Sequence, residues 1–128
     1  METTSVNGKV YNVDMLVSTA HVLPIVVEPI ERFKKWVGKG HTYWIDCDEK
    51  ALGPYDILKD WDAAQRNPAW TDHVESIKQA NLEKPIWVMR DSGYVFDGMH
   101  RLTRAFLDKK SHIKVRYFDR LPKEALLR

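Results

Sequence analysis

The sequence predicts one small domain of the α/β (α+β) class, a mixed sheet flanked by helices. The chain has 128 residues, which is the usual size of a single domain. Hydrophobic residues make up 44% and charged residues 30%, a globular mixture rather than a disordered one. Segments with helical periodicity alternate with short β-branched or alternating runs, so helices and strands are both expected.

The first half predicts helices separated by short strands. Residues 1–9 are expected to form a flexible tail. Apolar residues at helical spacing predict a helix over residues 13–23, capped by Asn12 or Asp14 and ended by Pro24. The further elements expected here are a strand at 25–27, a short helix at 29–37, a strand at 42–45 and a helix from Pro54 to Asn67-Pro68.

The second half predicts a helix, a hairpin, a second helix and a strand. Asp72 and Glu75 have the spacing of a capping box at the start of the first helix. Asp91-Ser92-Gly93 separates the two strands of the hairpin. The expected ranges are strands at 85–89 and 94–96, a helix after Gly98, a half-buried strand at 113–118 and a last helical turn after Pro122.

Composition excludes some classes of function. The formal net charge is +2, too small for a protein that coats nucleic acid through bulk charge. Cys47 is the single cysteine, so no intramolecular disulfide is expected, and a cytoplasmic location is favoured. No apolar run reaches the roughly 18 residues of a membrane span. The five histidines share no metal-ligand spacing, which argues against a zinc site.

The segment Asp97-Gly98-Met99-His100-Arg101 lies where a predicted strand turns into a predicted helix. Gly98 permits a sharp turn and a close backbone approach. The first amides of a helix lack intrahelical partners and lie at the positive end of its dipole, which favours anions. His100 and Arg101 add side-chain donors, and Asp97 offers an oxygen to a ribose hydroxyl or to Mg²⁺. As a purely structural alternative, Asp97 caps the helix and Gly98 only makes the turn.

Residues 74–119 resemble the ParB/sulfiredoxin-like superfamily. The block from Glu75 to Val88 resembles the family's helix, loop and Pro-Ile strand, and residues 94–105 resemble its strand, nucleotide turn and helix. Residues 113–117 resemble its closing strand, whereas residues 10–70 are divergent. The resemblance implies one domain over residues 1–128 with a core at 71–119. It also implies that Gly98, Met99, His100 and Arg101 bind the phosphates of ATP or another nucleoside triphosphate.

Two departures from the family's patterns argue against two of its functions, sulfinic-acid reduction and DNA partition. Sulfiredoxins carry a catalytic cysteine in the turn, where this chain has Met99, whose thioether cannot act as that nucleophile. ParB partition proteins carry Gly-Glu-Arg-Arg followed by a helix-turn-helix domain, and neither is present between Gly98 and Arg128. The Asp-Gly-X-X-Arg form is similar to the free serine kinase branch and to small ParB-like proteins without an assigned function.

By resemblance to the kinase branch, the expected function is ATP-dependent phosphoryl transfer to a small hydroxyl-bearing substrate. Asp56, Asp97 and His100 are the candidate catalytic residues, and Asp97 is the candidate Mg²⁺ ligand. Asp56 follows a proline well upstream of the turn, as the family's acidic residue does, although that residue is a glutamate. In the alternative interpretation, Asp56 only stabilises a helix N-terminus.

A second hypothesis keeps the fold without catalysis. In it, the chain is a ParB-like module that binds a nucleotide, a nucleic acid or a protein partner and acts as a regulator or as a phage or plasmid accessory factor. Lys109, Lys110 and Lys114 with Arg116 form a local basic group that suits this interpretation, although such groups are more often solvated faces. Neither hypothesis fixes an oligomeric state.

Overall fold

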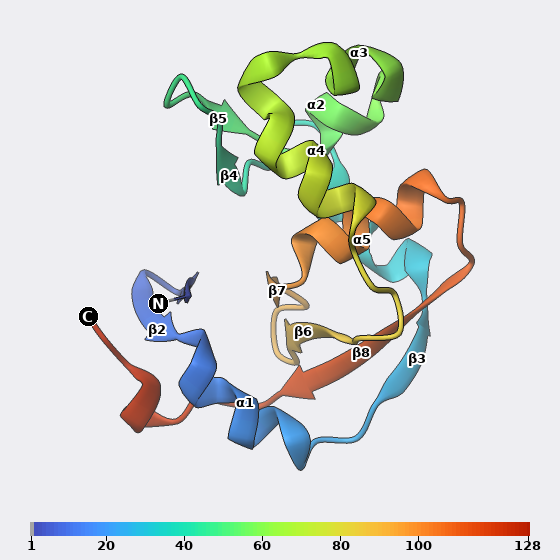
Figure 1. Cartoon of the computed structure of the whole chain (residues 1–128). Helices are drawn as coiled ribbons and strands as arrows, with labels where there is room; N and C mark the ends of the chain where they lie inside the picture. The colour runs from blue at the N-terminus through green and yellow to red at the C-terminus, as the bar shows by residue number, and fades with distance from the viewer. Residues whose placement is uncertain (1) are drawn as a thin grey trace.

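A four-stranded mixed sheet forms the centre of the molecule, with the strand order β3-β8-β6-β7. The computed structural model describes residues 2–128. β6 is antiparallel to β7 and parallel to β8, and β8 is antiparallel to β3. The strands are β3 (Val26–Pro29), β6 (Ile86–Met89), β7 (Val95–Asp97) and β8 (His112–Phe118) (Figure 1).

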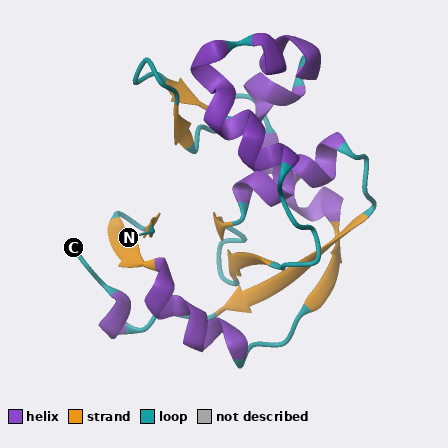
Figure 2. Cartoon of the chain, viewed as in Figure 1, coloured by secondary structure: helices purple, strands orange, loops and turns teal. Residues whose placement is uncertain are grey.

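Helices cover both faces of this sheet, which confirms the predicted fold class (Figure 2). One face packs against α5 (Met99–Leu107) and the 3₁₀ helix η1 (Ile30–Val37), and the other packs against α1 (Val13–His21). The parallel pair β6 and β8 needs a crossover, and α5 supplies it.

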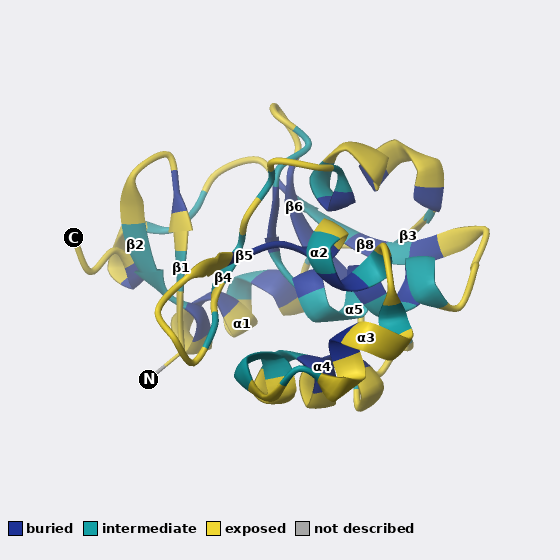
Figure 3. Cartoon of the chain, turned by 90° about the horizontal axis from the view of Figure 1, so that it is seen from above, coloured by how far each residue is buried: buried dark blue, intermediate teal, exposed yellow. Residues whose placement is uncertain are grey.

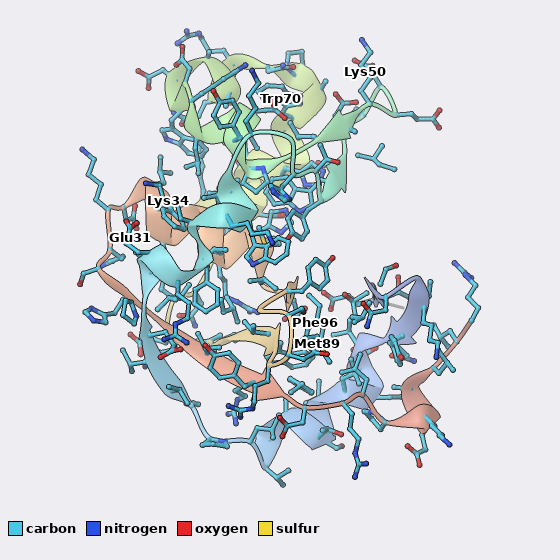
Figure 4. All side chains as sticks on the ribbon, turned by 180° about the vertical axis from the view of Figure 1, so that it is seen from behind. Glu31, Lys34, Lys50, Trp70, Met89 and Phe96 are labelled. Atoms are coloured by element: carbon cyan, nitrogen blue, oxygen red, sulfur yellow. The ribbon has the colours of Figure 1, made fainter. Side chains whose placement is uncertain are left out.

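The alternation of β6 side chains creates two separate cores. Ile86 and Val88 point into a core with η1 and α5, while Trp87 and Met89 point into a core with α1. All four residues are buried, so β6 is the most enclosed strand (Figure 3). Figure 4 shows Met89 and Phe96 between the sheet and the N-terminal elements.

A third core lies among short helices above α5. It contains Leu52, Ile57, Ala64, Val74 and Ile77. The elements of this region are β4 (Trp44–Ile45), β5 (Ala51–Leu52), α2 (Pro54–Leu58), α3 (Trp61–Arg66), η2 (Pro68–Trp70) and α4 (Thr71–Lys78).

The expectation of a flexible tail over residues 1–9 is wrong for the part that the structure describes; Met1 lies outside it. β1 (Thr3–Val6) and β2 (Lys9–Asn12) form an antiparallel hairpin. Val6 is buried in the core beside α1, and the Thr4 hydroxyl donates to the carbonyl of Phe96 on the edge strand β7. The C-terminal η3 (Lys123–Ala125) is the predicted last turn.

Two helix boundaries also differ from expectation. The predicted helix from Pro54 is split, because Asp60 leaves helical geometry and its carboxylate accepts from the Ala63 N–H at 3.0 Å. Asp72 does not form a capping box, because α4 begins at Thr71 with Trp70 as its N-cap, so Asp72 lies inside the helix, and the N-cap makes no side-chain hydrogen bond. The Asn12 cap of α1 is confirmed, since its side chain accepts from the Asp14 N–H at 2.9 Å.

Candidate functional site

Gly98 has the left-handed conformation that only glycine adopts without strain, with φ 99° and ψ 24°. Space also requires glycine at this position. A Cβ here would lie 2.7 Å from Cγ2 of Ile86 and 2.8 Å from Nη2 of Arg101. The connection from β7 to α5 therefore passes through a position, residue 98, at which any side chain would clash with its neighbours.

The amides after Gly98 lie at the start of α5 and are free of partners. The first backbone hydrogen bond of α5 runs from the Leu102 N–H to the Gly98 carbonyl at 2.9 Å. Among residues 2–128, no group accepts a hydrogen bond from the N–H groups of Met99, His100 and Arg101. These amides stand at the positive end of the helix dipole, as the sequence predicts.

Two cavities meet at this turn, one of about 420 Å³ and one of about 470 Å³. Both are lined by Glu2, Asp97, Gly98 and His100. The smaller cavity lies between β1, the segment before β4 and the turn. The larger cavity lies between α1, the end of α4 and the turn. The turn is thus the shared wall of two spaces of ligand size.

Arg101 and Asp97 form an ion pair at this wall, with Nη2 to Oδ2 at 2.8 Å. Both side chains are about four-fifths buried. Burial raises the pKa of Asp97, while Arg101 acts to lower it. The guanidinium that the sequence predicts as a phosphate ligand is therefore held by Asp97, and its Nε is buried without a partner.

His100 is neutral in its surroundings. Burial, His73 and Arg101 together lower the pKa of His100 from 6.5 to about 4. Its ring lies parallel to that of Trp44, with centroids 4.5 Å apart, and its Nε2 lies 3.1 Å from Nδ1 of His73. His100 therefore offers a phosphate no positive charge at neutral pH.

Met99 and Asp56 differ from the other predicted residues in their placement. The Met99 side chain is buried in the core beside α5, although Met99 also borders the smaller cavity. Asp56 lies in α2, where its carboxylate accepts from the Gly53 N–H at 3.0 Å. Asp56 is not among the described residues that line either cavity. The structure thus brings together five of the six predicted residues.

The sequence did not single out several side chains at this site. Tyr43, Trp44 and Tyr94 line the smaller cavity, and His73 reaches it through His100. The hydroxyl of Tyr43 is buried without a partner, and burial raises the pKa of Tyr43 well above its usual value. These residues are far from the turn in sequence, except Tyr94, so no local motif marks them.

A metal ion at this site would need oxygen atoms from a bound small molecule in addition to those of the protein. Within residues 2–128, no three His, Cys, Asp or Glu side chains gather in a way that could hold a metal ion. Asp97 alone supplies a carboxylate at the turn itself. Each helix within residues 2–128 is too short or too polar to span a bilayer.

Comparison with known proteins adds no relative: no family model, curated protein or solved structure matches the chain. The resemblance to the ParB/sulfiredoxin-like superfamily therefore stays a prediction from residues 74–119.

Proposed function

We propose that the chain binds the phosphate groups of a nucleotide at residues 97–101. The observation that carries this proposal is the set of three unpartnered amides after Gly98, on a wall shared by two cavities. Backbone N–H groups at a helix start bind phosphate oxygens by direct donation and through the helix dipole. The cavity volumes fall within the range of small-molecule sites.

Charge at the turn favours a nucleotide that arrives with Mg²⁺. The larger cavity is lined by the carboxylates of Glu2, Asp14 and Asp97 and by only two cations, Lys84 and Arg101. Mg²⁺ commonly takes one or two carboxylates together with substrate phosphates, and Asp97 has the oxygen that such a site uses. Bound phosphates would compete with Asp97 for the guanidinium of Arg101.

The reaction that we propose is transfer of the γ-phosphoryl group of ATP to the hydroxyl of a small molecule. The bond from the γ-phosphorus to the bridging oxygen breaks to leave ADP, and a bond to the acceptor oxygen forms. The proton of the acceptor hydroxyl passes to a base on the protein. His100 lines both cavities and is uncharged, so it suits this role better than Asp56, which lines neither.

Amide NMR tests the binding step directly. ATP, CTP and inorganic pyrophosphate, each with Mg²⁺, are titrated into the ¹⁵N-labelled chain. We expect the largest downfield proton shifts at the amides of Met99, His100 and Arg101. The amides of Thr71 and Asp72 at the start of α4 are the internal control. If the signals of residues 99–101 stay in place up to millimolar ligand, the proposal is wrong.

A second measurement separates the enzyme from a regulator. ADP formation from ATP and Mg²⁺ is followed with a panel of small hydroxyl compounds. ADP that depends on one compound supports phosphoryl transfer. Binding at the turn without ADP from any compound favours the non-catalytic module, whose partner is then a nucleic acid or a protein.

A further inference from the structure

Trp44, His73 and His100 form a stack of rings from three separate elements. The ring of His100, on α5, lies 4.5 Å from that of Trp44, on β4, at an interplanar angle of 5°. The ring of His73, on α4, lies 5.0 Å from Trp44 at 19°. The two imidazoles therefore lie edge to edge over one indole, with their nitrogens 3.1 Å apart.

The hydrogen bonds of this stack determine where the protons are. Nε2 of His73 lies 2.9 Å from the carbonyl oxygen of Ile45. A carbonyl can only accept, so Nε2 of His73 carries a proton and Nδ1 of neutral His73 carries a lone pair. Nε2 of His100 must then be the donor to that Nδ1. Nδ1 of His100 is left as a bare acceptor.

We propose that His73 is a positioning residue that holds His100 in the Nε2–H tautomer, so that Nδ1 of His100 accepts a proton from a ligand hydroxyl at the turn. Its use in phosphoryl transfer rests on the proposed function, whereas the tautomer belongs to the free protein. His100 lines both cavities, and His73 lines neither. His73 therefore acts through His100 rather than by touching the ligand.

The proton transfer needs no rearrangement of the stack. The ligand O–H bond breaks and an N–H bond forms at Nδ1 of His100, while Nε2–H continues to donate to His73. Trp44 lies against the resulting imidazolium, and an indole face favours a cation. His73 and Arg101 both disfavour this charge, and the carboxylate residues Asp97 and Glu2 line the same two cavities as His100.

Long-range ¹H–¹⁵N correlation spectra of the ligand-free protein at pH 7.5 report the tautomer of each histidine. We expect His100 and His73 both to show protonated Nε2 and bare Nδ1. In His73→Phe, the ring remains for Trp44 but the acceptor is lost, so the His100 signal becomes a mixture of tautomers. In His73→Gln, the amide oxygen can accept from His100 and restores the Nε2–H form.

His112→Phe is the matched control, because His112 is exposed on β8 and, within residues 2–128, its ring bonds only to the Ser111 hydroxyl. This variant leaves the His100 spectrum unchanged. A protonated Nδ1 on His100 in the native protein, or an unaltered tautomer in His73→Phe, overturns the proposal. Should His73→Phe fail to fold, the native spectrum and the His73→Gln spectrum still decide the question.

The two proposals can fail separately. If nucleotides do not bind but the tautomer is as expected, the proposed function is wrong and the role of His73 in setting the tautomer stands. If ADP forms, we expect His73→Phe to lower kcat about two- to fivefold, as the fraction of His100 with a bare Nδ1 falls, and to change the KM for ATP less than twofold. An unchanged kcat would show that the reaction does not depend on the tautomer that His73 sets.

Discussion

The guanidinium of Arg101 fills the space beside Gly98 that a side chain at position 98 would need. Arg101 folds back along the first turn of α5 to reach Asp97, four residues before it. The Arg101 side chain thus occupies the space next to Gly98, and it also pairs with the largely buried carboxylate of Asp97.

Gly98→Ala is expected to destabilise the protein by about 2–4 kcal/mol. The change adds left-handed strain of about 1–2 kcal/mol to a clash with Ile86 and Arg101. Gly93→Ala is the control, because Gly93 also has a positive φ of 72° but has open space around its Cβ position. Urea unfolding of both variants measures the difference, and equal losses would show that close contact at Gly98 is unimportant.

Arg101→Met is expected to cost about 2 kcal/mol at pH 7, because it leaves the Asp97 carboxylate buried without its partner. Loss of Arg101 also raises the pKa of Asp97 further, so the cost becomes smaller as the pH falls and Asp97 takes up a proton. Asp119→Ala, which breaks the exposed pair with Arg90 at the same 2.8 Å and leaves Arg90 over the Tyr117 ring, is expected to cost less than about 0.5 kcal/mol. A pH-independent loss in Arg101→Met would contradict this account.

Acid is expected to destabilise the protein through His100. The pKa of His100 is about 4 in the folded chain against 6.5 for the ordinary residue, so below pH 6.5 the unfolded chain binds the proton more readily. Stability is therefore full above pH 6.5 and is lost as the pH falls toward 4, by about 3 kcal/mol. Asp97, whose pKa is raised, acts in the opposite direction.

A comparison of the native chain with His100→Gln isolates the contribution of His100, because Asp97 is present in both proteins. Unfolding free energies between pH 4 and 7.5 are expected to depend less on pH in His100→Gln than in the native chain. His112→Gln, at an exposed position, retains the native slope. An identical slope in His100→Gln would show that His100 is not the titrating group.

Asp56 has a structural role that can be separated from a catalytic one. Asp56→Ala removes the acceptor of the Gly53 N–H and is expected to destabilise the protein by about 1 kcal/mol. Asp56→Asn keeps an oxygen acceptor and retains most of this stability. If phosphoryl transfer is observed, we expect Asp56→Asn to retain it as well, and a loss of more than tenfold in kcat would assign Asp56 to the reaction.

The sheet and the turn were largely predictable, because residues 85–118 carry strong local signals. Alternating apolar and polar residues mark β8, and Gly98 marks the point where β7 ends and α5 begins. The N-terminal hairpin was missed although its turn, Asn7-Gly8, has a typical hairpin sequence. Both residues adopt positive φ, 51° and 77°, as a tight hairpin requires.

The composition of the site was only partly predictable. The motif identifies Arg101 and His100, but the charge pairing of Arg101 and the hydrogen bonding of His100 depend on the residues beside them. The carboxylate of Asp97 accepts a hydrogen bond from the guanidinium of Arg101, and Nδ1 of His73 lies within hydrogen-bond distance of Nε2 of His100. His73 and Trp44 reach the turn only because α4 and β4 fold over α5, and no spacing in the sequence encodes that approach.

The last residues of the chain pair with β2 of the N-terminal hairpin, whose other strand, β1, lines the smaller cavity. The Val10 N–H donates to the Arg128 carbonyl at 2.7 Å, and the Leu127 N–H donates to the Val10 carbonyl at 2.8 Å. These contacts close very long loops, whereas the β6–β7 hairpin and α5 form from neighbours in sequence. Long loops cost the most entropy to close and slow their own formation. During refolding, we therefore expect the central strands to assemble first and the wall that β1 gives to the smaller cavity to form last.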